Sequence, residues 1–149
     1  MIVAMVEAMT KHRGVGLAAP QLGVPWRIIV VSRLARAVEG VPAFECDGEV
    51  YDDFGVYINP EILERSAETD VATEGCLTLK GLSRDIERPK AIRVRALGIP
   101  VHPLSGLAAR IVQHEFDHLE GRLITDHRDA AVPDQYRLSR FLGRAGGVG

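Results

Sequence analysis

The sequence predicts an α+β fold in which an antiparallel β-sheet packs on one strongly marked helix. Residues 91–97 alternate between apolar and charged side chains, as in a strand with one buried face and one exposed face. Residues 106–121 carry the most strongly marked helical pattern of the chain, and several strand-like segments precede it. Because strands and helices do not alternate regularly, the pattern favours this class over a parallel α/β sheet.

The first segment is expected to be a helix that ends near Gly14. Its apolar side chains recur at helical spacing and form one stripe: Ile2, Met5, Val6 and Met9. Residues 14–23 contain three glycines and a proline, so we expect a shaped loop and no regular element there. The β-branched apolar run at residues 27–32 predicts a buried strand.

The middle and the end of the chain are less regular. Residues 33–55 lack a clear periodicity and are expected to form an irregular excursion or a poorly formed hairpin. A strand at residues 56–59 should stop at Pro60, and residues 61–70 should continue as a second strand. Ser105 is the expected cap of the helix that ends at Gly121, and a last amphipathic helix is expected at residues 133–144.

The composition fits one domain that spans residues 1–149. Apolar residues make up 46% and charged residues 26% of the chain, which is long enough to bury a core. The 18 basic and 20 acidic residues give a formal net charge of −2, which argues against direct nucleic-acid binding by phosphate neutralisation. Two cysteines suit a reducing, cytoplasmic compartment. We expect neither a signal peptide nor a membrane span.

The clearest chemical signal is the pentapeptide at residues 114–118, which has the form H-E-x-x-H. On a helix, residues four apart point in nearly the same direction, so His114 and His118 can present both imidazoles to one metal ion. Glu115 is rotated by about 100° from His114, which suits a carboxylate that moves protons beside the metal without binding it. Leu107 and Ile111 share the histidine face, and no other polar group is expected on it.

Cys76 is a candidate third ligand. A lone cysteine between Gly75 and apolar residues is usually a small buried hydrophobe, and two histidines can also join a core by chance. Two unpaired imidazoles would be costly to bury, however, and a thiolate completes a three-ligand site that leaves a fourth position for water. In the loop at residues 14–23, Gln21 is a neutral amide that could donate a hydrogen bond to a developing oxyanion.

Three segments together resemble the signature motifs of the peptide deformylases. They are G-V-G-L-A-A-P-Q-L-G, E-G-C-L-T and Q-H-E-F-D-H-L-E-G, in this order, and the similarity runs from about Met5 to Asp126. The resemblance implies antiparallel sheets around the H-E-x-x-H helix and a metal-dependent hydrolase. Such an enzyme removes the formyl group from nascent N-formylmethionyl peptides and releases formate. It also implies one divalent ion per chain, with Fe²⁺ favoured and Zn²⁺, Ni²⁺ or Co²⁺ able to substitute.

The resemblance also assigns roles to residues. Cys76, His114 and His118 correspond to the metal ligands, and Glu115 corresponds to the general acid and base. Gln21 and the backbone N–H of Leu77 correspond to the groups that polarise the formyl oxygen. The residues expected to line the substrate pocket or hold the peptide backbone are Val15, Gly16, Glu74, Leu107 and Ile111. Expected partners are nascent formyl-Met peptides in a bacterial-type cytoplasm, with the ribosome exit region as a further candidate.

The chain departs from the family pattern at several places. It starts inside the first helix and is therefore N-terminally short relative to the family. Thr78 replaces a usual serine, Lys80 stands where a proline is common, residues 97–106 are shortened, and residues 33–55 are extended. Two alternatives remain open: a hydrolase of altered specificity, and a non-catalytic relative that keeps the metal site to bind peptide N-termini. A purely structural metal site has no need of Glu115, which counts against the second.

Overall fold

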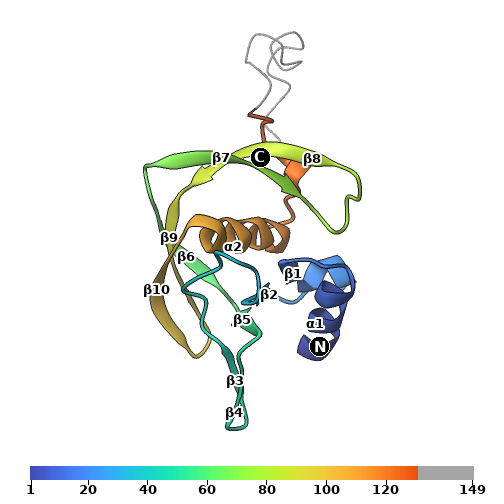
Figure 1. Ribbon diagram of the computed structural model, residues 1–149, viewed down its shortest axis with the longest axis vertical. Helices are drawn as coiled ribbons and strands as arrows, with labels where there is room; N and C mark the ends of the chain where they lie inside the picture. The colour runs from blue at the N-terminus through green and yellow to red at the C-terminus, as the bar shows by residue number, and fades with distance from the viewer. Residues whose placement is uncertain (131–149) are drawn as a thin grey trace.

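Helix α2 (Gly106–Leu119) lies at the centre of the computed structural model, and antiparallel strands surround it (Figure 1). The structure describes residues 1–130. The predicted class, α+β with antiparallel sheets around the helix that bears H-E-x-x-H, is therefore confirmed. Within the described part, no helix is long and apolar enough to span a membrane. The helix predicted at residues 133–144 lies outside the described residues.

One side of the molecule is a three-stranded sheet covered by a helix. Its elements are α1 (Ile2–Lys11), β1 (Gly16–Ala18), the short 3-10 helix η1 (Ala19–Leu22), β2 (Ile28–Ser32) and β5 (Phe54–Ile58). The strand order is β1-β2-β5. Ile29 and Val31 of β2 pack in the core under α2, whereas Ile28 and Val30 pack in the core under α1. Because β2 is buried on both faces, its sequence is continuously apolar.

The second three-stranded sheet packs on the other side of α2. It contains β6 (Glu61–Arg65), β9 (Ala91–Ala96) and β10 (Ile99–Ser105), in the order β10-β9-β6. Ile92 and Val94 of β9 are buried, and Arg93 and Arg95 are exposed, as the alternating pattern predicts. A two-residue turn at Leu97 and Gly98 joins β9 to β10, so the shortened stretch still closes a hairpin.

Two further hairpins complete the fold. β7 (Thr69–Gly75) and β8 (Ser83–Pro89) pair over seven residues and arch over α2 in Figure 1. β3 (Phe44–Cys46) and β4 (Glu49–Tyr51) form a small hairpin that projects from the opposite end of the molecule. The segment at residues 33–55 therefore contains a formed hairpin and not only an irregular excursion. A second 3-10 helix, η2 (Ile124–Asp126), follows α2.

Three expectations from the sequence are wrong. Residues 14–23 contain regular structure, because Gly16–Ala18 pairs with β2. Residues 61–70 are not one strand: β6 ends at Arg65 and β7 begins at Thr69. Ser105 stands at the N-cap of α2, but its side chain makes no capping hydrogen bond with any of residues 1–130, because the residue is still part of β10.

Candidate active site

Helix α2 places three of the predicted site residues side by side. Glu115 and His118 are buried, and the side chain of His114 is only 11% exposed. The Nε2 atoms of the two histidines lie 3.3 Å apart. The i, i+4 spacing therefore brings both imidazoles to one point, as the pentapeptide predicts.

Cys76 reaches the same point from the turn that follows β7. Its Sγ atom lies 3.4 Å from His118 Nε2, and one ligand atom from each of Cys76, His114 and His118 lies within 4.8 Å of the others. Two nitrogens that bind one ion tetrahedrally at about 2.0–2.1 Å are themselves about 3.3 Å apart. The donor set and its spacing therefore fit a divalent metal ion.

The cysteine is held in the form that binds metals. Burial raises the pKa of the Cys76 thiol, but hydrogen bonds with His114, His118 and Thr78 outweigh burial and lower the pKa to about 5. Thr78 Oγ1 lies 3.1 Å from the sulfur, so the hydroxyl that replaces the usual serine makes this contact. A thiol with such a pKa is a thiolate at neutral pH, and the thiolate is the metal ligand.

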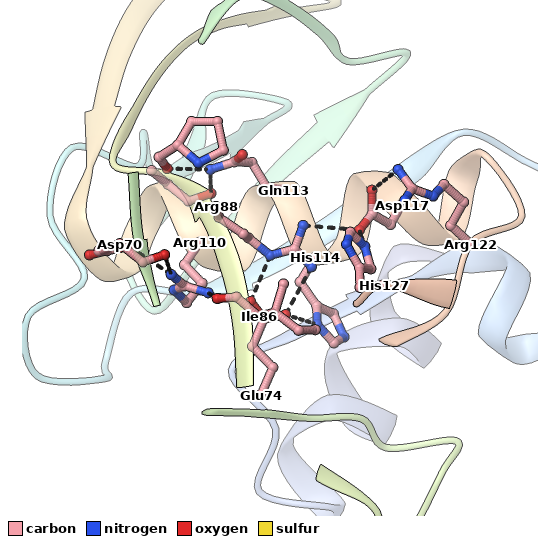
Figure 2. Close-up of polar contacts among 12 residues, drawn as sticks. Asp70, Glu74, Ile86, Arg88, Arg110, Gln113, His114, Asp117, Arg122 and His127 are labelled. Carbon is pink, nitrogen blue, oxygen red and sulfur yellow. Dashed lines mark hydrogen bonds and ion pairs between the residues drawn. The ribbon is translucent and has the colours of Figure 1, made fainter. Parts of the chain in front are cut away.

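A carboxylate behind His114 fixes the orientation of its ring. Glu74 Oε1 lies 2.8 Å from His114 Nδ1, so Nδ1–H donates to the carboxylate and Nε2 faces the cluster (Figure 2). Burial lowers the pKa of His114, but hydrogen bonds with Cys76 and Glu74 outweigh burial and raise it to about 10. A carboxylate hydrogen bond of this kind is the usual support of a metal-binding histidine.

Two buried arginines hold Glu74 in turn. Arg88 donates from Nε and Nη2 to the two carboxylate oxygens at 2.6 and 2.9 Å, and Arg110 Nη1 donates to Oε2 at 2.7 Å (Figure 2). Burial raises the pKa of Glu74, but the hydrogen bonds from His114, Arg88 and Arg110 outweigh it and hold the pKa well below its usual range. Glu74 is thus ionised, and both of its carboxylate oxygens accept hydrogen bonds. The residue also lines the cavity described below.

The arginine network continues to both ends of α2. Arg88 Nη1 donates to Asp117 at 3.0 Å, and His127 Nε2 lies 2.6 Å from the same Asp117 oxygen. At the other end, Arg110 Nη2 donates to Asp70 at 2.6 Å. Figure 2 shows this continuous line of contacts from Asp70 to His127.

The sequence reasoning missed this network. Arg110 lies four residues before His114 on α2 and is only 9% exposed, so the expectation that the histidine face carries no other polar group is wrong. The four-residue spacing between Arg110 and His114 could have indicated this contact, because residues four apart share one face of a helix. Nothing in the sequence around Arg88 indicates its part in the network, because its contacts come entirely from tertiary structure.

Gln21 contacts Cys76 from the short 3-10 helix η1. The backbone N–H of Ala18 donates to Gln21 Oε1 at 2.8 Å, which turns the amide so that Nε2 donates toward Cys76 Sγ at 3.6 Å. The local fold that achieves this is η1, which starts directly after β1. Gln21 and His118 together line a pocket that is separate from the cavity described below.

Glu115 forms no salt bridge with any residue of the described part of the chain, residues 1–130. Its Oε2 atom is buried and has no hydrogen-bond partner among residues 1–130. Burial raises the pKa of Glu115 to about 7. Gly16 of β1 packs directly on this side chain, because a Cβ added there would lie 2.9 Å from Glu115 Cγ and from Ile111 Cγ2. A buried carboxyl group that titrates near neutral pH is suited to general acid–base catalysis.

A cavity of about 390 Å³ opens beside the cluster. Apolar side chains form one wall of it: Val15, Leu77, Leu107 and Ile111. Leu107 is 39% exposed and Val15 is 42% exposed, so these two lie at the open surface of the cavity and not in the core. Cys76, His114 and Glu115 also line it. The arrangement is an apolar pocket with three potential metal ligands and a buried carboxyl group close together.

Comparisons with known proteins agree with this geometry. The polypeptide deformylase family model matches residues 1–133. Peptide deformylase 1 of Clostridium perfringens is 41% identical over 132 residues, which cover 85% of this chain and 78% of the relative. The peptide deformylase of Thermotoga petrophila is 43% identical over 129 residues, covering 84% of this chain and 68% of the relative.

Solved structures give the same result. The peptide deformylase of Plasmodium falciparum superposes with a TM-score of 0.73 at 30% identity, over 95% of this chain and 77% of that chain. A probable peptide deformylase from Synechococcus phage S-SSM7 gives a TM-score of 0.69 at 37% identity, over 85% of this chain and 80% of that chain. The fold around α2 is therefore shared with these solved structures, and this chain belongs to the polypeptide deformylase family.

Proposed function

We propose that this chain is a metal-dependent peptide deformylase that hydrolyses the formyl group from N-formylmethionyl peptides and releases formate. One observation carries the mechanism. The ligand atoms of Cys76, His114 and His118 converge beside the buried, unpaired carboxylate of Glu115, at the wall of an apolar cavity. A structural metal site has no use for such a carboxylate, whereas amide hydrolysis requires one.

Cys76, His114 and His118 are the proposed ligands of one divalent ion. Fe²⁺ is favoured by the family resemblance, and the set of one sulfur and two nitrogens also suits Zn²⁺, Co²⁺ or Ni²⁺. When bound, the ion would lower the pKa of a water molecule and polarise the formyl oxygen. Glu74 accepts the Nδ1–H of His114, so Nε2 is the ring nitrogen directed at the site, and its proton would be displaced by a bound ion.

Glu115 is the proposed proton carrier. It accepts the proton of the attacking water and then gives it to the amine that leaves, as a general base and then a general acid. Its pKa of about 7, raised by burial, allows both steps near neutral pH. The close packing of Gly16 and Ile111 limits the positions that the carboxylate can adopt.

Gln21 and the backbone N–H of Leu77 are the proposed donors to the formyl oxygen. Negative charge develops on this oxygen in the transition state, and fixed donors stabilise it. The hydrogen bond from Ala18 keeps the Gln21 NH₂ group turned toward the cluster, so the donor is already oriented before the substrate binds.

The methionine side chain is proposed to lie against Val15, Leu107 and Ile111. A thioether is slender and flexible and fills an apolar cavity well. Gly16, at the edge strand β1, lets the peptide backbone come close to the reacting groups. Glu74 contributes the stem of its side chain to the same wall.

We further propose that residues 1–149 form a single catalytic domain that works on nascent peptides in a bacterial-type cytoplasm. The ribosome exit region is a candidate partner. Direct nucleic-acid binding is not expected from the charge balance of the chain.

The decisive experiment loads the full chain with Fe²⁺ under anaerobic conditions and supplies formyl-Met-Ala-Ala. We expect one equivalent of formate for each free amine produced. Elemental analysis should find one ion per chain, and Cys76→Ala should lose tight binding because two imidazoles alone make a poor site. Cys46→Ala, which removes the exposed cysteine, is the matched control and should keep the ion. Full occupancy in the Cys76 variant, or no formate from the loaded enzyme, would contradict the proposal.

A further inference from the structure

Arg13 is the one charged residue on the cavity wall whose side chain is exposed and unpaired within residues 1–130. The other charged groups on this wall are buried or engaged: Glu74 and Arg110 bind each other, and Glu115 is covered by Gly16. Arg13 is exposed, and its guanidinium makes no hydrogen bond or ion pair within the described part of the chain. A free cation at the open side of a substrate cavity attracts anionic groups of the substrate.

The backbone at Arg13 ends helix α1 and fixes where this residue leaves the helix. Arg13 has φ = 54°, in the left-handed region that residues with a Cβ rarely adopt. The helix end accounts for this conformation, because the N–H of Arg13 donates to Thr10 O at 3.1 Å and the N–H of Gly14 donates to Met9 O at 2.9 Å. The proposal below therefore rests on the exposed, unpaired guanidinium at the cavity.

The distance along the chain indicates which part of a peptide Arg13 would meet. Gly16 packs on Glu115, and Arg13 lies three positions before Gly16, a span of at most about 10 Å in extended chain. A formyl carbon beside Glu115 would place the second and third residues of an extended peptide roughly 6 to 10 Å away. The side chain of Arg13 can therefore reach the side chains of these two residues.

We infer that Arg13 is a specificity-determining residue that favours formyl-Met peptides with Asp or Glu at the second or third position. The inference rests on the proposed deformylase function and adds a substrate class to it. The ion pair between Arg13 and the acidic side chain of the substrate would be exposed to solvent. The expected preference for the acidic peptide is therefore modest, about two- to five-fold in kcat/KM over a peptide with a neutral residue of the same size. Salt screens such pairs, so the preference should weaken as the ionic strength rises.

The test compares glutamate with glutamine in otherwise identical peptides. The substrates are formyl-Met-Glu-Ala, formyl-Met-Ala-Glu and their Gln counterparts, all with an amidated C-terminus so that no terminal carboxylate competes. The metal-loaded wild type should prefer Glu at one or both positions at low salt, and less so in 0.5 M NaCl, a concentration of the order that shortens the screening length to a few ångströms. This measurement needs no variant.

Variants then assign the preference to Arg13. Arg13→Gln should bring the Glu/Gln ratio to about one, and Arg13→Glu should reverse it. Lys11→Gln removes the same charge from the same exposed segment without touching the cavity, and should leave the ratio unchanged. Equal ratios in the wild type, or an equal loss of preference in the Lys11 variant, would overturn the inference. Absence of hydrolysis for every peptide would instead overturn the proposed function.

Discussion

Glu74 Oε1 and His114 Nδ1 are joined by a 2.8 Å hydrogen bond that links strand β7 to helix α2. Glu74 stands two residues before Cys76, so one short segment supplies a proposed ligand and also orients another on a different element. The same carboxylate accepts hydrogen bonds from Arg88 and Arg110. The cluster is therefore positioned by a buried ionic network, and the packing of apolar residues alone does not account for its geometry.

Glu74→Gln should weaken metal binding. The amide still accepts one hydrogen bond but no longer carries the charge that keeps the proton on His114 Nδ1. Loss of such a supporting group typically lowers metal affinity by about 10- to 100-fold. Competition with a chromophoric chelator would measure the change. Asp70→Asn alters the half-exposed end of the network, away from the histidine, and should change the affinity less. Equal affinities for the wild type and Glu74→Gln would exclude the positioning role.

Arg88→Met should destabilise the fold strongly. The side chains of Arg88 and Glu74 are both close to 5% exposed, and removing one partner of a buried ion pair leaves the other charge uncompensated. The expected loss is about 3–5 kcal/mol in the free energy of unfolding. Urea denaturation of the metal-free protein separates this effect from metal binding.

Arg95→Met is the matched control for this substitution. Arg95 pairs with Glu61 at 3.0 Å, but the two side chains are 50% and 58% exposed. An exposed pair contributes at most about 1 kcal/mol. Similar losses for the two variants would show that burial does not decide the strength of the Arg88 contacts.

The elements that could be predicted from the sequence are those with one apolar face. Strand β9 alternates because Ile92, Val94 and Ala96 face the core, whereas the two arginines between them face away from it. Strand β8 was not predicted, because Arg88 occupies one of its buried positions. A charged residue on the core face interrupts the alternation of apolar and polar side chains that would indicate a strand. Strand β10 contains Pro100 and Pro103, and prolines usually argue against a strand. They are tolerated here because β10 lies at the edge of its sheet.

The β3–β4 hairpin has a local signal in its turn residues, although its strands show no clear periodicity. Asp47 and Gly48 form its two-residue turn, with φ values of 51° and 80°. Asp-Gly is a frequent pair in the turns that need two positive φ values. The cluster itself could be predicted because each of its three segments carries a distinctive motif. Arg88 and Asp70 belong to none of these motifs, and only the paired β7–β8 hairpin brings them to the helix.

Glu115→Gln should keep the metal and lose most of the turnover. The amide has nearly the same shape, but it cannot accept and return a proton. General acid–base groups typically contribute about 10²- to 10⁴-fold to the rate. Steady-state formate release and elemental analysis on the same samples test both halves of the prediction. Glu120→Gln, at the exposed end of the same helix, should leave the rate near that of the wild type. Near-normal activity of the Glu115 variant would remove it from the mechanism.

Gly16→Ala should displace Glu115. The added Cβ would lie 2.9 Å from Glu115 Cγ and from Ile111 Cγ2, and both are side chains with little room to move. We expect a destabilisation of about 1–3 kcal/mol and a kcat reduced by up to about 10²-fold, with the metal retained. At Gly14 the closest contact is the end of the Leu77 side chain, which can rotate away. Gly14→Ala should therefore lower kcat less, and a larger loss there would contradict this account of Gly16.

Formyl-Met peptides should react faster than formyl-Ala peptides. The apolar wall of Val15, Leu107 and Ile111 can bury the methionine thioether, whereas alanine leaves the wall uncovered. Each buried methylene is worth about 0.8 kcal/mol, so the missing groups should lower kcat/KM by roughly one to two orders of magnitude. Leu107→Ala should reduce this ratio, because Leu107 is part of the wall. Leu97→Ala, at the exposed turn between β9 and β10, should not change it. Comparable kcat/KM values for the formyl-Met and formyl-Ala peptides would mean that this wall does not select the substrate.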